Sequence, residues 1–283
     1  MAEIVIMDFS GIYKEEQFFE GEKVSWLDVR EIPGTNCYCD DEAKTQILEK
    51  LEEFSAGGIY FIDSGNYHYM SRIGIERVKE PFRLLVFDNH TDMQLPAFGG
   101  LLSCGGWIAS AIEEAENLVE VWLVGPDEEA YSQVEEPLKE KVKFFSREML
   151  QDFRNNESYS EKTNNMERNV MDFSFLGEIP TDLPLYVSID KDVLGTTDAS
   201  TTWSQGDMTL GEMMAALEFV TRHFKEAGGK ILQVDICGEC DVTEPGNSAL
   251  HDMANAALLE FFTSTDVGED IEENKNGTTG GNG

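Results

Sequence analysis

Short runs of apolar, β-branched and aromatic residues recur along the chain, and they constrain its fold more than any other feature. Nearly continuous apolar runs of this length are typical of strands covered on both faces, as in a parallel sheet. Between them, apolar residues recur at helical spacing. This alternation predicts an α/β fold of three layers, with a mostly parallel central sheet and helices on both faces. The runs are Ile4–Met7, Ile59–Ile62, Leu84–Phe87, Val119–Val124, Val142–Phe145, Leu185–Ile189 and Ile231–Ile236, and the helical patterns are Glu42–Phe54, Leu210–Phe224 and Ala249–Phe262.

The composition indicates a folded protein with few classes of partner. Of the 283 residues, 41% are hydrophobic, enough for a sizeable core. The formal charge of −34 argues against binding to phosphate backbones or anionic membrane surfaces. The start, Met1–Asp8, lacks the basic residues and long apolar run of a signal peptide, and no stretch approaches the roughly 18 apolar residues that span a bilayer. Five cysteines, an odd number, suit a reducing compartment. We therefore expect a cytoplasmic protein with neither nucleic-acid nor membrane partners.

We expect one domain over residues 1–263. The stretch Gln151–Arg168 is rich in Asn, Glu and Ser and has no strong apolar period, so we interpret it as an excursion between two strands. Residues 264–283 are acidic and then rich in Asn and Gly. Such a segment has too few apolar residues to order itself, so we expect a disordered tail.

Potential metal ligands follow two of the predicted strands at the point where each strand ends. Leu84–Phe87 runs directly into Asp88-Asn89-His90-Thr91-Asp92, and Leu185–Ile189 runs into Asp190-Lys191-Asp192. Alternate residues of an extended backbone point the same way, so each motif presents its ligands on one side. Two aspartates on one side of a strand end repel each other unless a cation or a proton intervenes. Ligands of open α/β sheets bind at this end of the strands.

Two further candidates belong to the same edge. Ile59–Ile62 leads through Gly65 to His68, and Ile231–Ile236 is followed by Glu239. Two imidazoles and four aspartates are too many oxygen donors for one tetrahedral zinc ion. The mixture suits manganese, and bridging carboxylates suit two ions roughly 3.5–4 Å apart. Such a pair generates hydroxide near neutral pH, which attacks an electrophilic carbon or phosphorus.

The order of these motifs resembles that of the ureohydrolases, the family of arginases, agmatinases and formimidoylglutamases. That family has a Gly-rich turn ending in His, then Asp-x-His-x-Asp, then Ser-x-Asp-x-Asp. The counterparts here are Gly65–His68, Asp88–Asp92 and Ser188–Asp192. The resemblance covers roughly residues 59–262 and implies an arginase-like fold.

The resemblance also implies roles for the site residues. One Mn²⁺ is expected to bind His68, Asp88, Asp92 and Asp190; the other is expected to bind Asp88, His90, Asp190 and Asp192, with Asp88 and Asp190 bridging. Glu239 is similar to the family's late carboxylate, which meets the cationic group of the substrate. Glu239 and Asp92 are therefore the candidate catalytic residues.

The sequence departs from the family in two loops. Arginases and agmatinases place a proton-shuttling histidine soon after Asp-x-His-x-Asp, whereas Gly99–Trp107 here contains none and offers Cys104 instead. The Pro- and Gly-rich segment that follows Ser-x-Asp-x-Asp is altered to Thr201–Asp207. The cysteines of Cys37-Tyr38-Cys39 and Cys237–Cys240 could in principle hold zinc, but free, partly buried thiols are favoured.

These observations favour a hydrolase that cleaves a linear C–N bond in a guanidino or amidino compound. The expected partners are a small cationic substrate and further copies of the chain. Two alternatives remain: a metal-binding arginase homologue that has lost catalysis, which the missing histidine favours, and a metal-dependent amide deacetylase. Deacetylases of related fold typically use one zinc ion and tandem histidines, which this chain lacks.

Overall fold

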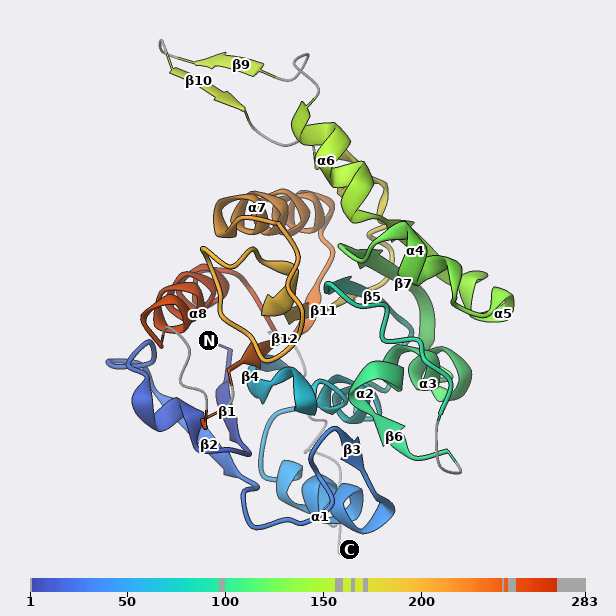
Figure 1. Cartoon of the computed structure of the whole chain (residues 1–283), viewed down its shortest axis with the longest axis vertical. Helices are drawn as coiled ribbons and strands as arrows, with labels where there is room; N and C mark the ends of the chain where they lie inside the picture. Colours follow the sequence, from blue (N-terminus) through green and yellow to red (C-terminus); the bar gives the residue numbers. More distant parts are fainter. Residues whose placement is uncertain are drawn as a thin grey trace, which may run out of the picture.

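A computed structural model describes residues 2–96, 100–155, 160–163, 166–169, 173–240, 242–243 and 248–268. Its centre is an eight-stranded sheet in the order β2-β1-β4-β12-β11-β5-β7-β8, with every neighbouring pair parallel (Figure 1). The strands of this sheet are β1 (Ile4–Asp8), β2 (Val24–Asp28), β4 (Gly58–Ser64), β5 (Phe82–Phe87), β7 (Leu118–Val124), β8 (Val142–Phe145), β11 (Leu185–Asp190) and β12 (Ile231–Glu239). The helices are α1 (Asp41–Leu51), α2 (Met70–Ile75), α3 (Trp107–Glu114), α4 (Glu128–Ser132), α5 (Glu136–Lys139), α6 (Arg147–Asn155), α7 (Leu210–Ala227) and α8 (Ser248–Thr263).

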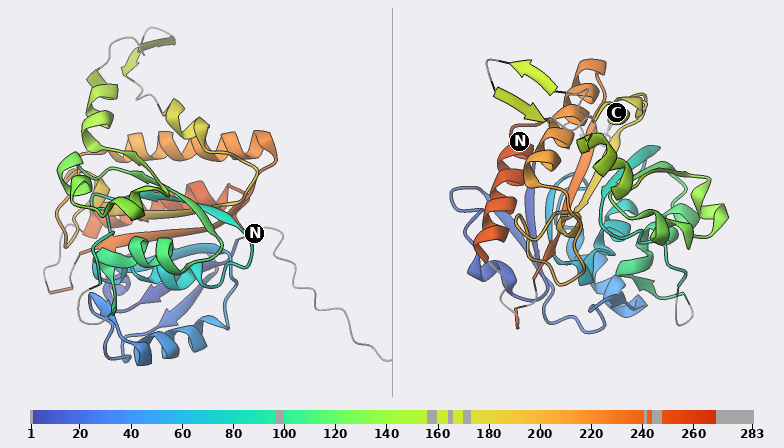
Figure 2. Two further views of the ribbon diagram at one scale, coloured as in Figure 1. Left: turned by 90° about the vertical axis from the view of Figure 1, so that its right-hand side faces the viewer. Right: turned by 45° about the horizontal axis from the view of Figure 1, so that its top comes forward.

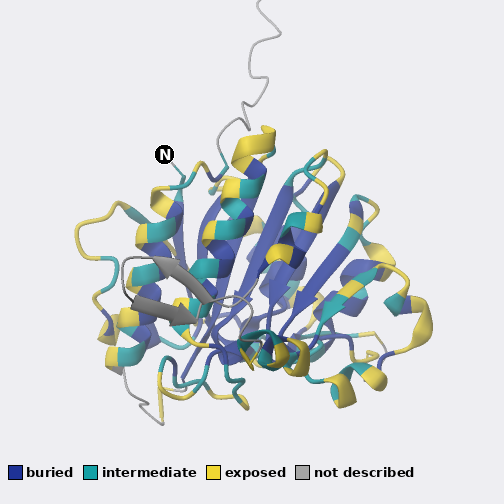
Figure 3. Cartoon of the chain, turned by 90° about the horizontal axis from the view of Figure 1, so that it is seen from above, coloured by how far each residue is buried: buried dark blue, intermediate teal, exposed yellow. Residues whose placement is uncertain are grey.

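Helices cover both faces of the sheet, and the strands are buried between them (Figures 2 and 3). Alternate residues of a strand point to opposite faces, which gives the protein two cores. In β1, Ile4 and Ile6 pack with α7 and α8, whereas Val5 and Met7 pack with α1, α2 and α3. The expected three-layer α/β/α fold with a parallel sheet is therefore confirmed.

The helix ends carry sequence signals of their own. The hydroxyl of Thr209 accepts from the backbone N–H of Glu212, and the Glu212 carboxylate accepts from the backbone N–H of Thr209, which forms a capping box at the start of α7. Gly228 ends α7 with a φ of +73°, a conformation that glycine adopts without strain. Asp40 caps α1 by accepting from the backbone N–H of Ala43 at 2.8 Å.

Each apolar run predicted as a strand lies in a strand of the sheet. Two of the helical patterns lie in α7 and α8, and the third corresponds to α1, which ends at Leu51, before the predicted end at Phe54. The strand β2 was not predicted. It is an edge strand in which only Leu27 is buried, so its sequence lacks the continuous apolar run of the central strands. No helix in the described part of the chain is long and apolar enough to cross a membrane.

Two segments contain elements that the sequence did not predict. Gln151–Arg168 lies between β8 and β11, as expected of an excursion between two strands of the sheet, and it contains the end of α6 and a separate two-stranded ribbon, β9 (Ser160–Thr163) with β10 (Met166–Asn169). The packed structure also continues beyond Ser264, because Val267 is fully buried and bridges Ile231. The rest of the expected tail, residues 269–283, lies outside the described residues.

The four central strands, β4, β12, β11 and β5, bring the sequence motifs together. They are neighbours in the sheet, they run parallel, and their carboxyl ends therefore meet at one edge. β4 leads through the short helix η2 (Gly65–Tyr67) to His68, β5 leads to Asp88, and β11 ends at Asp190.

Candidate metal centre

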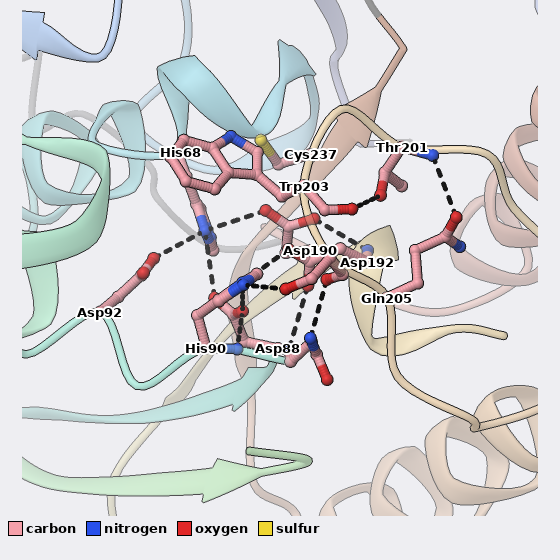
Figure 4. A network of polar contacts seen from close by, with 12 residues as sticks. His68, Asp88, His90, Asp92, Asp190, Asp192, Thr201, Trp203, Gln205 and Cys237 are labelled. Carbon is pink, nitrogen blue, oxygen red and sulfur yellow. Dashed lines mark hydrogen bonds and ion pairs between the residues drawn. The ribbon is translucent and has the colours of Figure 1, made fainter. Parts of the chain in front are cut away.

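His68 forms the first half of the candidate site. It is almost fully buried, and its Nδ1 lies 3.3 Å from Asp88 Oδ2, 3.1 Å from Asp92 Oδ2 and 3.4 Å from Asp190 Oδ2 (Figure 4). The other ring nitrogen, Nε2, is 2.9 Å from the hydroxyl of Ser188. One imidazole nitrogen thus faces three carboxylates from two strand ends, while the other is held by a hydroxyl.

His90 forms the second half. Its Nδ1 lies 2.8 Å from Asp192 Oδ2 and 3.6 Å from Asp88 Oδ1. Its Nε2 is 2.9 Å from the hydroxyl of Ser204. The side chain of His90 is one-third exposed, at 33%, so this half lies nearer to solvent than the half around His68.

Asp88 joins the two halves. Its Oδ2 faces His68 and its Oδ1 faces His90. The Oδ2 atom is buried and accepts no hydrogen bond from any described residue. A buried carboxylate oxygen without a hydrogen-bond donor is costly unless a nearby cation offsets it, so this atom is suited to binding a metal ion.

The ligand geometry fits metal ions. The ligand atoms of His68, Asp88 and Asp92 lie within 4.8 Å of one another, and so do those of Asp88, His90 and Asp192. Carboxylate-rich sets with imidazole nitrogens suit manganese better than they suit softer ions. Asp190 lies against the first group through its Oδ2, while its Oδ1 accepts from the backbone N–H of Asp192 at 2.9 Å.

Burial and mutual repulsion set the electrostatics of the site. Burial, and then the charges of Asp190 and Asp88, raise the pKa of Asp192 well above its usual range. Burial, and then Asp88, raise the pKa of Asp92 to about 7. Burial opposes protonation of His68, but the adjacent carboxylates of Asp88, Asp92 and Asp190 outweigh it and raise the pKa of the imidazole well above its usual value. Without metal, the cluster therefore holds extra protons that a bound cation would replace.

Further contacts orient the candidate ligands. The indole N–H of Trp107 donates to Asp92 Oδ2 at 2.7 Å, and the backbone N–H of Asn89 donates to Asp192 Oδ1 at 3.0 Å. Asp92 itself has a φ of +47°, an uncommon conformation for a residue other than glycine. At Gly238, with a φ of +100°, a Cβ would lie 2.5 Å from Asp190 Oδ1. Glycine at that position therefore lets β12 approach the candidate ligand closely.

A cavity of about 230 Å³ opens onto the candidate ligands. Asp88, His90, Asp92, Asp190 and Asp192 line it. The other lining residues in the described part of the chain carry no formal charge; they are Cys37, Tyr38, Gly65, Gln94, Ser103, Cys104, Gly105 and Trp203. The space suits a compact substrate, and Cys104 belongs to the loop in which the sequence lacks the expected histidine.

Glu239 lies at the end of β12, at the expected edge of the sheet, but it does not face the cavity. It is not among the residues that line the cavity, and its side chain is fully buried. Its Oε1 accepts from the ammonium group of Lys191, and its Oε2 lies 2.8 Å from Nδ1 of His251. The assignment of Glu239 to the cationic group of a substrate therefore needs correction, because a buried cation of the protein already neutralises this carboxylate.

The pair formed by Lys191 and Glu239 belongs to a buried polar cluster behind the candidate ligands. Asn255 connects its members: its carbonyl accepts from Lys191 at 2.8 Å, and its amide donates to Glu239 at 2.8 Å and to Glu16 at 2.9 Å. Burial, and then the charge of Glu239, raise the pKa of Glu16 to about 9, so Glu16 is neutral at pH 7. Lys191 lies between Asp190 and Asp192, so this cluster anchors the turn that carries both aspartates.

Sequence reasoning missed the residues that support the ligands. Ser188 was part of a recognised motif but received no role, and Trp107 and Ser204 were not singled out. Only Ser188 had a local signal, because it precedes Asp190 by two residues and therefore points to the same side of β11. Trp107, the first residue of α3, and Ser204 reach the site through contacts that the sequence pattern does not reveal.

The chain is similar to several known proteins. No protein-family model matches the sequence. An uncharacterized protein of Thermotoga maritima is 29% identical over 263 residues, which cover 92% of this chain and 90% of that protein.

Among solved structures, formimidoylglutamase from Bacillus subtilis matches with a TM-score of 0.64 and 13% identity, over 92% of this chain and 87% of that chain. Arginase from Bacillus caldovelox matches with a TM-score of 0.63 and 15% identity, over 93% of this chain and 98% of that chain. Proclavaminate amidino hydrolase from Streptomyces clavuligerus matches with a TM-score of 0.61 and 14% identity, over 91% of this chain and 89% of that chain. At these identities the likeness is one of fold.

Proposed function

The chain has the arginase-like α/β fold, and from that premise we propose that it is a divergent ureohydrolase-type enzyme that uses two divalent metal ions. The observation that carries this proposal is the geometry around Asp88, whose two carboxylate oxygens face two different imidazoles. A carboxylate placed between two imidazoles could help to hold a pair of ions, whereas a single ion beside one histidine would leave the other without a metal.

The contacts of His68 and His90 support two ligand sets, and the resemblance to the ureohydrolases adds Asp190 to the second. We assign His68, Asp88, Asp92 and Asp190 to one ion, and Asp88, His90, Asp190 and Asp192 to the other. The donor chemistry favours manganese. When bound, the two ions supply a hydroxide nucleophile at neutral pH and polarise the bond under attack.

The chain itself positions the ligands and shapes the site. The hydroxyl of Ser188 fixes the imidazole ring of His68 so that Nδ1 is directed at the carboxylates, and the indole of Trp107 fixes Asp92. Asp92 also lines the cavity, so it remains our candidate catalytic residue next to the reacting group. The buried half around His68 keeps bulk water away from that side.

The names of the structural neighbours favour a C–N bond in a guanidino or amidino compound as the substrate. The cavity limits this class further. Apart from the candidate ligands, the described residues of its wall include Gln94, Ser103 and Tyr38, which offer amide and hydroxyl groups rather than a carboxylate. We therefore propose a small substrate that is held by neutral hydrogen bonds and by the metal centre, without an ion pair to Glu239.

A product assay tests the proposal. Protein loaded with manganese is incubated with arginine, agmatine, guanidinobutyrate and formimidoylglutamate, and the release of urea, formamide or ammonia is measured. We expect release from at least one compound, its loss on chelation, and its recovery when manganese is restored. Asp190→Asn is the matched inactive variant. Metal-independent release, or release that Asp190→Asn retains in full, would contradict the proposed chemistry.

The second candidate function is a metal-binding homologue without catalysis. The observation that favours it is Cys104, which lines the cavity in the loop where the resemblance leads one to expect a proton-shuttling histidine. Binding of manganese together with inactivity toward every amidino and guanidino compound tested would support this candidate. Activity in wild type that Cys104→Ser abolishes would instead give Cys104 a direct role in turnover.

A further inference from the structure

Two thiols face each other beside the candidate metal centre. The short strands β3 (Tyr38–Cys39) and β6 (Leu102–Ser103) pair antiparallel, with Tyr38 opposite Ser103 and Cys39 opposite Leu102. The same register, continued by one residue, places Cys37 opposite Cys104. The backbone confirms this continuation, because the N–H of Cys104 donates to the carbonyl of Cys37 at 2.9 Å.

This placement meets the geometric requirement for a disulfide. Residues directly opposite in an antiparallel pair have Cα atoms about 4.5–5.5 Å apart, which lies within the roughly 4.4–6.8 Å that a disulfide spans. The side chains also interact: burial raises the pKa of Cys37, and a hydrogen bond with the side chain of Cys104 offsets part of that rise. Cys37 has a φ of +60°, an uncommon conformation for a residue other than glycine.

Both thiols line the cavity above the metal ligands, and both are unpaired cysteines in this structure. The other cysteines do not line it. Cys39 is directed at the carbonyl of Asp40, with its Sγ 3.7 Å from that oxygen, and Cys237 is fully enclosed in β12. Among the described residues, Cys37 and Cys104 are therefore the two thiols that a small oxidant entering this cavity would meet.

We propose that Cys37 and Cys104 form a reversible disulfide in the cavity wall, made by a hydroperoxide and broken by a dithiol. One sulfur attacks a peroxide oxygen, which gives a sulfenic acid and releases water when the oxidant is hydrogen peroxide. The second sulfur displaces the hydroxyl of that sulfenic acid, so an S–S bond forms and a second water leaves. The two thiols lose two electrons in total and the peroxide gains them. A dithiol reverses the change by exchange.

The disulfide would alter the site that the proposed function uses. Cys104 begins the short helix η3 (Cys104–Gly106), which leads directly into α3 and Trp107, the donor to Asp92. The carbonyl of Gly105 accepts from the backbone N–H of Gln94, another residue of the cavity wall, at 2.9 Å. A covalent bond at Cys104 therefore fixes this wall against β3 and restricts its adjustment to a substrate. This effect on turnover rests on the proposed function, whereas formation of the bond does not.

Burial, and then the charge of Asp92, raise the pKa of Cys104, as burial raises that of Cys37. Both sulfurs are therefore thiols rather than thiolates at neutral pH, and thiols react slowly with peroxides. The pair is accordingly expected to respond to sustained oxidation rather than to act as a rapid peroxidase.

Thiol counting and peptide mapping test the proposal on the intact chain. Folded protein is treated with hydrogen peroxide, quenched with an alkylating agent, unfolded and digested. We expect titratable thiols to fall from five per chain to three, with Cys37 and Cys104 recovered in one cross-linked peptide. Dithiothreitol should restore all five. A count that stays at five, or a cross-link from Cys104 to any other cysteine, would overturn the assignment.

Single substitutions provide the matched controls. Cys37→Ser and Cys104→Ser should each start with four thiols and lose no pair, whereas Cys39→Ser should still lose two. Loss of a thiol pair in Cys37→Ser would contradict the proposal. The oxidised wild type should also melt several degrees higher than the reduced protein, because the bond closes a long loop. The cross-link is read by mass, so failure of the amidino-compound assay would not affect this result.

Discussion

The buried pair of Lys191 and Glu239 gives a prediction whose size can be worked out from the structure. Both side chains are fully buried, and Lys191 also donates to Asn255 at 2.8 Å. Lys191→Met keeps the length of the side chain and removes the charge, which leaves the imidazole of His251, 2.8 Å away, as the cationic partner of the buried Glu239 carboxylate. Breaking a buried ion pair from one side costs about 3–5 kcal/mol of folding free energy.

Thermal unfolding followed by circular dichroism measures this loss. For a domain of this size, 1 kcal/mol shifts the melting temperature by roughly 2–4 °C, so Lys191→Met should melt about 6–20 °C below wild type. Lys225→Met is the matched control, since Lys225 is exposed and lies 3.6 Å from an exposed carboxylate of Asp266, a pair worth at most about 1 kcal/mol. The double variant Lys191→Met with Glu239→Gln should recover part of the loss, because it removes the charge that Lys191 neutralises in wild type.

The pH dependence provides an independent check. Burial opposes ionisation of Glu239, but Lys191 and then His251 outweigh it and hold the pKa of this carboxyl below its usual range. A carboxyl whose pKa is lower in the folded state adds stability above its unfolded pKa of about 4.3, and that stability is lost as the pH falls. The gap between wild type and Lys191→Met should therefore be widest near pH 7 and shrink below about pH 5. Equal melting temperatures at pH 7 would refute the reasoning.

Three further predictions concern the chain end and the metal centre. Ending the chain after Gly268 should leave the melting temperature unchanged, whereas ending it before Val267 should cost roughly 1.5–3 kcal/mol in thermal melts, because that buried side chain is lost. Binding of manganese should release about two protons at pH 7 and strengthen as the pH rises, because the neighbouring aspartates raise the pKa of His68 and His90 against the effect of burial. Calorimetry in buffers of different ionisation enthalpy measures the number of protons released, and a value of zero would contradict the prediction. Asp88→Asn should reduce manganese to below one ion per chain by elemental analysis, since both ions share this residue; a retained pair would mean that it does not bridge.

The sequence predicted the centre of the fold and of the site more fully than their edges. Strands buried on both faces have continuous runs of apolar residues, which the sequence reveals. The residues that directly follow such strands are placed at the edge of the sheet. The half-exposed strand β2 has no such signal, because solvent covers part of it and polar residues are tolerated there. The packing of Val267 beside β12 was missed for a similar reason, because a single apolar residue in an otherwise polar segment forms no recognisable pattern.

The sequence did not reveal the role of Glu239, because its partner Lys191 stands at the unspecified position of the Asp-x-Asp motif. Lys191 begins the short helix η6 (Lys191–Val193) directly after β11, and its ammonium group donates to Glu239. The buried cluster around Lys191 and Glu239 also depends on α8, which supplies His251 and Asn255. The sequence pattern does not reveal where this helix packs.

An anomalous difference map of manganese-loaded crystals tests most directly whether the histidines and aspartates of the candidate site hold a pair of metal ions. We predict two peaks joined by Asp88, one beside Nδ1 of His68 and the other beside Nδ1 of His90. Asp190 should contact both ions. A single peak at saturating manganese, or two peaks away from Asp88, would contradict the binuclear centre and the chemistry proposed from it.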